Sequence, residues 1–228
     1  MSAVLDLPIT HTTSLTTIKK AVNLALDEQV SVILSNVAWE TYQNTIQEFW
    51  GKQNPHFYYD RGALLIMSNS SEHEFYNRII ASLIDILAEQ FQQNWISLGS
   101  ATYQREDLEK GFEPDSCFYF ANEPQIRRVK RLDMMIHPAP DLIVEVDITS
   151  LSTGRQSIFA AFGVPEIWRF DGEKMQILKL ENDKYVEISN SLALPKVTAE
   201  KLTEFVSKSE TLSRLEWINE VRSWAKTV

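Results

Sequence analysis

The sequence predicts an α/β fold: a mixed β-sheet core flanked by helices, with a C-terminal helical extension. Residues 142–146 form an almost unbroken apolar run, which is typical of a central strand covered on both faces. Apolar residues recur at helical spacing through 75–91, which predicts a long amphipathic helix. Strand-like and helical segments follow one another along the chain, and this order favours a sheet with helices packed on its faces.

The first half of the chain is predicted to contain two short helices, a strand, a hairpin and the long helix. The hairpin turns at Asp60-Arg61-Gly62, where glycine supplies the positive φ of a tight turn. Ser35 or Asn36 caps the second helix, which carries its apolar residues on one side. The predicted elements are helix 14–28, strand 30–34, a helix through residues 39–49, strands 57–59 and 63–67, and a helix from 69–74 to 91.

The second half alternates strands with turns and ends in helices. Gly163 is a plausible C-cap for the helix before it, and Asp171-Gly172 marks a turn. The predicted elements are strands 95–105 and 112–120, an irregular stretch 122–137, strand 141–148, helix 152–162, strand 166–170, strands 174–180 and 184–188, and helices 198–207 and 211–224. We expect a variable segment 1–29, a main domain 30–190, and an extension 191–228 that joins this domain or contacts a second copy.

Composition limits the class of protein. The 228 residues fit one domain, and 44% hydrophobic with 23% charged residues is ordinary for a globular protein. Cys117 is the single cysteine, so no intramolecular disulfide or cysteine zinc site forms, and we interpret it as an inert buried thiol. No secretion signal and no apolar run of about 18 residues is visible, so we expect a cytoplasmic protein without membrane contact.

The net charge bears on nucleic-acid binding. A formal charge of −9 weighs against avid nonspecific binding to DNA, which depends on lysine and arginine neutralising phosphates. One local basic run, Arg127-Arg128-Val129-Lys130-Arg131, could still contact a phosphate backbone; a solvated surface is the alternative. The nucleic-acid-binding candidates are Arg127, Arg128, Lys130, Arg131 and His73.

Carboxylates interrupt the two apolar strands. Asp115 precedes one apolar run, and Glu145 and Asp147 lie in and after the other, two residues apart and therefore on one face. Burying a charge is costly unless it is paired or binds a metal. Two carboxylates from neighbouring strands can hold Mg²⁺ or Mn²⁺, so these residues predict a divalent-metal site for phosphoryl transfer. Capping of strand ends or pairing with arginine is the alternative.

The start of the long helix has two interpretations. Ser71-x-x-Glu74 matches a capping box, in which the glutamate reaches back to the cap amide. Glu74 would otherwise be a site residue. His73 is either exposed at the helix start or in contact with substrate, because histidine changes charge near neutral pH.

Taken in order, several motifs resemble one protein family. The chain over about 30–190 is similar to the Uma-two endonucleases, also called domain of unknown function 820, of the PD-(D/E)XK restriction-endonuclease-like superfamily. Residues 145–150 resemble a cyanobacterial subgroup. The resemblance implies a restriction-endonuclease-like fold. The motifs that carry it are Tyr59-Asp60-x-Gly62, Ile66-Met67-Ser68, Glu72-His73-Glu74, Pro114-Asp115, 140–146 and Phe162-Gly163-Val164-Pro165-Glu166-Ile167-Trp168.

The resemblance also assigns roles. Asp115 is the motif aspartate, Glu145 the second metal ligand, and Glu74 lies near the superfamily's helical acid. The superfamily lysine is expected two residues after the second acid, where this chain has Asp147, a possible third ligand. Many relatives carry the lysine in the next helix, where this chain has Arg155. Arginine can clamp a phosphate but does not deprotonate, so it cannot be a general base.

The function implied by the resemblance is metal-dependent hydrolysis of DNA phosphodiester bonds, with Mg²⁺ or Mn²⁺ as cofactor. A homodimer is expected, because many nucleases of this fold pair to reach two strands, and the apolar C-terminal helix is a candidate interface. The departure at Asp147 and Arg155 keeps a second class open: a catalytically degenerate relative that binds DNA or protein on the same scaffold.

Overall fold

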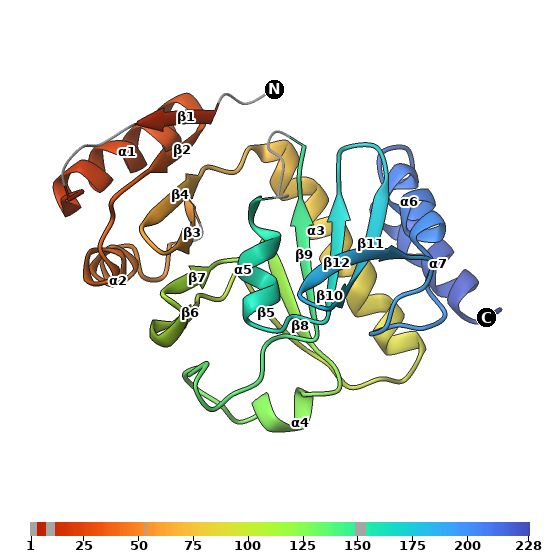
Figure 1. Ribbon diagram of the computed structural model, residues 1–228. Helices are drawn as coiled ribbons and strands as arrows, with labels where there is room; N and C mark the ends of the chain where they lie inside the picture. Colours follow the sequence, from red (N-terminus) through yellow and green to blue (C-terminus); the bar gives the residue numbers. More distant parts are fainter. Residues whose placement is uncertain (1–3, 8–11, 53, 149–153) are drawn as a thin grey trace.

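The computed structural model describes residues 4–7, 12–52, 54–148 and 154–228, and its strands form two sheets (Figure 1). The first sheet has the order β1 (Val4–Leu7), β2 (Ser31–Leu34), β4 (Ala63–Met67), β3 (His56–Asp60), β7 (Lys110–Phe112), β6 (Tyr103–Arg105). The second has the order β12 (Lys184–Ile188), β11 (Met175–Glu181), β10 (Glu166–Phe170), β9 (Leu142–Val146), β8 (Ser116–Tyr119), β5 (Ile96–Gly99). Both sheets mix parallel and antiparallel pairs, so the α/β class is confirmed.

Helices cover both sheets (Figure 1). On one face of the second sheet lies a core built with the long helix and the two C-terminal helices, and α5 lies toward the opposite face. The first two helices pack on the first sheet. These helices are α1 (Leu15–Glu28), α2 (Trp39–Glu48), α3 (Ser71–Gln90), α5 (Gln156–Ala161), α6 (Ala199–Lys208) and α7 (Arg214–Ala225).

The central position predicted for the apolar strand is confirmed. β9 pairs in parallel with β10 and antiparallel with β8, and all five of its residues are buried. Leu142, Val144 and Val146 enter the core under α3, while Ile143 enters the core beside α5. Glu145 has the parity of Ile143, so its side chain points toward the α5 side of the sheet.

The prediction of one sheet is wrong, because two predicted strands each divide and cross between sheets. The strand expected over 95–105 becomes β5 and β6, and the strand expected over 112–120 becomes β7 and β8. Between β7 and β8 stands Pro114, which has no N–H for a ladder hydrogen bond. The chain therefore leaves one sheet at Glu113-Pro114-Asp115 and joins the other, and Asp115 lies at the junction of the two sheets.

Smaller differences concern the loops and ends. A short helix α4 (Glu123–Ile126) lies in the stretch expected to be irregular, and β1 lies in the segment expected to be variable. The start of the helix expected over 152–162 lies outside the described residues, and within them the structure has α5. None of the helices in the described ranges has the length and apolarity needed to cross a lipid bilayer.

The C-terminal helices are built into the core. Trp217, Val221 and Ala225 of α7 are buried in the same cluster as the inner face of α3, and Trp217 Nε1 donates a hydrogen bond to the Phe205 carbonyl of α6 at 2.7 Å. Leu215 stays exposed on the outer side of α7. The dimer predicted through this helix stays a prediction.

Gly111 gives a stability prediction. A Cβ at this position of β7 would lie 2.1 Å from Tyr42 Oη, and the Tyr42 ring is buried and stacked on Tyr59 with centroids 4.6 Å apart. The ring cannot withdraw without opening this stack, so we expect Gly111→Ala to lower the unfolding free energy by about 1–3 kcal/mol. Thermal unfolding checks this. Gly154→Ala, where the added methyl meets nothing within 4 Å, is the control. Equal melting temperatures for the two variants would contradict the prediction.

Candidate active site

Six titratable side chains are buried together where the two sheets meet. They come from the start of β3, the first turn of α3, the crossing segment before β8, strand β9 and its end, and the residue before α5. Charged residues are almost never fully buried unless they are paired. The six are His56, His73, Asp115, Glu145, Asp147 and Arg155.

Asp115 is held by one backbone donor and two histidines. Its Oδ2 accepts a hydrogen bond from the Val146 N–H at 2.8 Å, which ties the crossing segment to β9. His73 Nε2 lies 3.1 Å from Oδ2, and His56 Nδ1 lies 3.3 Å from Oδ1. Burial would raise the pKa of the Asp115 carboxyl, but the charges of His73 and then the contact with His56 outweigh it and hold this pKa below its usual range.

The local structure of α3 aims His73 at this site. Ser70 is the N-cap, and its Oγ accepts the His73 N–H at 3.1 Å. The capping box predicted at Ser71 and Glu74 is therefore wrong, because the helix is capped one residue earlier. The placement of His73 at the surface is also wrong: the residue is 3% exposed. Glu74 points away and pairs with Arg78 at 2.5 Å.

The Glu145 side chain is fully buried, and among the residues that the structure describes only one of its two carboxylate oxygens has hydrogen-bond or ion-pair partners. Arg155 Nη1 lies 2.8 Å from its Oε2, and Tyr58 Oη donates to the same oxygen at 3.4 Å. Its Oε1 has no hydrogen-bond partner among the described residues. Burial raises the pKa of the Glu145 carboxyl well above its usual value; Arg155 opposes this shift, and the charges of Asp115 and Asp147 reinforce it.

Two arginines hold Asp147. Arg155 Nη2 lies 2.6 Å from Oδ1, and Arg169 Nε lies 2.6 Å from Oδ2. The Arg155 guanidinium also lies over the Tyr58 ring, 4.6 Å from its centroid. Burial would lower the pKa of Arg155, but Glu145 and the neighbouring acids raise it, so this cation is permanent. Pairing with arginine, the alternative left open by the sequence, is what the structure shows for Asp147.

Unpaired polar atoms concentrate at this junction. Of eleven buried side-chain nitrogen and oxygen atoms without a hydrogen-bond partner in the described ranges, six belong to this cluster. Buried polar atoms in native proteins are nearly always paired, so this concentration singles out the junction as a candidate site, and three of the six atoms lie in the histidine–aspartate ion pairs described above. The six are His56 Nδ1, His73 Nδ1, His73 Nε2, Asp115 Oδ1, Glu145 Oε1 and Arg155 Nε.

Three residues that contact the buried cluster were not predicted from the sequence. His56, Tyr58 and Arg169 contact the site from strands β3 and β10. No spacing pattern connects them to Asp115, because the pairing of β3 with β7 and of β10 with β9 is what brings them near. Asn77 was missed as well: its Nδ2 donates to the Asp115 carbonyl at 3.1 Å, and its helical spacing from His73 is the only signal that could have found it.

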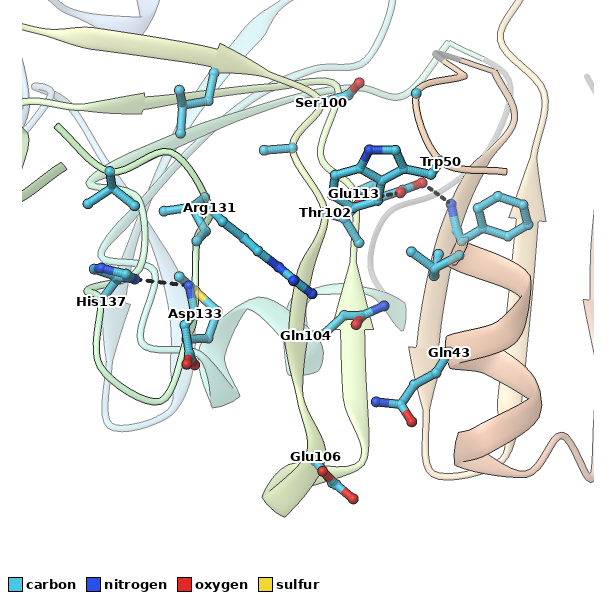
Figure 2. A pocket seen from close by; sticks show the side chains of 18 of the residues that line it. Gln43, Trp50, Ser100, Thr102, Gln104, Glu106, Glu113, Arg131, Asp133 and His137 are labelled. Carbon is cyan, nitrogen blue, oxygen red and sulfur yellow. Dashed lines mark hydrogen bonds between the residues drawn. The ribbon is translucent and has the colours of Figure 1, made fainter. Parts of the chain in front are cut away.

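The basic run lies apart from the carboxylates. Arg127 pairs with Glu123 at 2.6 Å, and Arg128 is exposed. Lys130 and Arg131 line a groove of about 950 Å³ between the 129–137 loop and the end of α2. Figure 2 shows Arg131 reaching into this groove from one wall.

Comparison with known proteins is consistent with this geometry. A family model, Uma2, described as "Putative restriction endonuclease", matches residues 39–213. Among solved structures, the chain is similar to a "putative nuclease belonging to DUF820" from Anabaena variabilis ATCC 29413. The two share 10% identity with a TM-score of 0.50, over 75% of this chain and 99% of that chain, a likeness that shows the fold alone. No curated protein matches.

Proposed function

Since this chain belongs to the Uma2 family, we propose that it is a metal-dependent endonuclease that hydrolyses DNA phosphodiester bonds. The observation that carries the proposal is the pair of carboxylates buried together at the sheet junction, Asp115 and Glu145, of which Glu145 has one oxygen, Oε1, that accepts no hydrogen bond within the described residues. Burying two carboxylates side by side costs free energy, and a bound divalent cation would offset this cost in addition to the two histidines and Arg155.

The donor set fits a hard divalent cation. Mg²⁺ and Mn²⁺ prefer oxygen ligands, and Mg²⁺ is commonly held by one or two carboxylates with water and substrate phosphate in the other positions. Asp115 and Glu145 would supply those carboxylates. Across the described ranges, no three histidine, cysteine or acidic side chains form a ready all-protein metal site. When bound, such a cation lowers the pKa of a coordinated water and offsets charge on the attacked phosphate.

The remaining residues would position this pair. Arg155 links Glu145 to Asp147, and Arg169 fixes the other oxygen of Asp147, so the end of β9 is rigidly oriented. In this arrangement Asp147 orients Arg155, and a third-ligand role requires its ion pairs to open. A phosphate contact by Arg155 likewise requires an ion pair to open. Glu74 stands outside the cluster, so a catalytic role for it requires contact with substrate at the surface.

One observation favours the second candidate function, a noncatalytic module that binds DNA or protein. Arg155 and Asp147 occupy the two positions where the family resemblance predicts lysine, and both side chains form buried ion pairs. Arginine cannot accept a proton from water, so general-base chemistry by a lysine is lost.

Metal binding separates the two candidates. We expect Mn²⁺ at a hundredfold excess over its Kd to stabilise the wild-type protein by about 2.7 kcal/mol, seen as a rise in melting temperature. Asp115→Asn should abolish this rise, and cleavage of supercoiled, linear or single-stranded DNA should disappear with it. Glu187→Gln, an exposed site with the same charge change, is the control. A wild-type protein with neither metal-dependent stabilisation nor cleavage would refute the enzyme proposal.

A further inference from the structure

The groove beside the candidate active site has the features of a nucleic-acid subsite. Its volume of about 950 Å³ lies at the upper end of the range for ligand pockets, roughly 300–1,000 Å³. One wall is the end of α2 and the residues after it, and the other is the 129–137 loop (Figure 2).

The cations of the groove are not used by the fold. Lys130 and Arg131 form no ion pair with any carboxylate in the described ranges, and Arg131 points from its loop toward Gln104 and Thr102 (Figure 2). Lys52 adds a third positive charge on the opposite wall. On a chain of net charge −9, cations left unpaired in one concave site favour an anionic ligand.

The groove also carries three acids, Glu106, Glu113 and Asp133, and the fold engages two of them in hydrogen bonds. Both oxygens of Glu113 accept hydrogen bonds, Oε2 from the Phe57 N–H at 3.0 Å and Oε1 from Thr102 Oγ1 at 2.6 Å. Burial raises the pKa of the Glu113 carboxyl above its usual value. Asp133 Oδ1 accepts the Met135 N–H at 2.9 Å. Glu106 is exposed.

Planar apolar surface completes the groove. Trp50 is 71% exposed, an uncommon state for tryptophan, whose large side chain is usually buried. On the same wall, Trp39 adds a second indole to the lining of the groove. An exposed tryptophan face beside cations is the combination that stacks a nucleobase and contacts its phosphate.

The groove adjoins the carboxylate cluster. Glu113 lies in its lining and Asp115 in the cluster, and two residues of extended chain span at most about 7 Å. A strand with a phosphate at Asp115 would therefore place the neighbouring nucleotide at the groove.

We infer that this groove binds an unpaired nucleotide of a DNA strand, with the base stacked on Trp50 and the phosphate backbone held by Arg131 and Lys130. A free base face is required, because the bases of a duplex are already stacked on one another. The inference rests on the proposed function for its substrate and specifies that substrate as DNA with single-stranded character.

Binding can be measured without cleavage. The probe is a fluorescently labelled single-stranded oligonucleotide, and the parent protein is Asp115→Asn, which removes turnover. We expect Trp50→Ala to weaken binding by about tenfold and Trp50→Phe to retain most of it, since a ring is what stacking needs. Arg131→Gln should weaken binding and reduce the salt dependence by about one counterion. A duplex of the same sequence should bind more weakly than the single strand.

Matched controls lie on α7, on the other side of the molecule (Figure 1). Leu215→Ala and Arg222→Gln remove an exposed apolar side chain and a cation there and should bind as the parent does. The inference would be overturned if Trp50→Ala and Arg131→Gln bound the oligonucleotide as tightly as the parent. It would also be overturned if the parent bound no oligonucleotide or preferred a peptide. Wild-type protein that cleaves nothing, with groove variants that still lose binding, would refute the nuclease and leave the groove supported.

Discussion

Replacing Arg155 with methionine is expected to lower the unfolding free energy by about 3–5 kcal/mol, the loss typical when one partner of a buried ion pair is removed. Arg155 is the charged partner of Glu145, and Asp147 is paired with both Arg155 and Arg169. Methionine has a similar length but no charge, so Glu145 would remain buried without a cation. In a protein of this size, that loss lowers the melting temperature by roughly 6–20 °C.

The pH dependence of the loss in unfolding free energy tests whether the uncompensated charge of Glu145 causes it. Without Arg155, the Glu145 carboxyl takes up a proton more readily, and protonation removes the uncompensated charge. The deficit of Arg155→Met should therefore be smaller near pH 5 than near pH 8. Arg155→Lys, which keeps the charge but cannot serve two carboxylates in one plane, should lose less. Arg222→Met, at an exposed ion pair on α7, is the control and should change stability by less than about 1 kcal/mol.

Replacing Glu145 with glutamine is expected to separate activity from stability. Metal-dependent cleavage should fall by about a hundredfold or more, the order of loss when a group that stabilises transition-state charge is removed. Stability should rise at neutral pH, because the amide can still accept a hydrogen bond from Arg155 without placing a charge in the core. Sites assembled for chemistry are commonly less stable than a neutral replacement.

The raised pKa of Glu145 fixes the sign of the effect with pH. A carboxyl with a higher pKa in the folded than in the unfolded state destabilises the fold once the pH exceeds the unfolded value, about 4.3, and increasingly up to the folded pKa. The melting temperatures of wild type and Glu145→Gln should therefore be close near pH 4 and diverge in favour of the variant as the pH rises. Lower stability of the variant at pH 8 would show that the ion pair with Arg155 outweighs burial.

Much of the secondary structure follows from the local pattern. The helical stripe of 75–91 and the apolar run of 142–146 correspond to α3 and β9, because a periodicity of 3.6 or a continuous apolar segment specifies what one element buries. The hairpin at Gly62 forms as β3 and β4, with Gly62 at φ +94°. These features depend on neighbours within a few residues.

The division of the strands into two sheets could not be predicted from the local hydrophobic pattern. Residues 112–120 carry strand-forming apolar residues on both sides of Glu113-Pro114-Asp115, yet β7 pairs with β3 and β8 pairs with β9. Which partner each half takes depends on strands more than twenty residues away along the chain, and local hydrophobicity does not distinguish the two choices. Pro114 was the one local sign of a break.

By itself, the sequence determined the helices, the central strand and the presence of carboxylates where apolar residues belong, because each is a property of contiguous residues. Only the tertiary structure decided that Asp115 stands between two sheets, that His56 and His73 converge on it, and that Arg155 is consumed by Glu145 and Asp147. The physical reason is that burial and pairing of charge are set by long-range packing: a side chain's partners are fixed by how strands and helices dock, and no spacing along the chain encodes them.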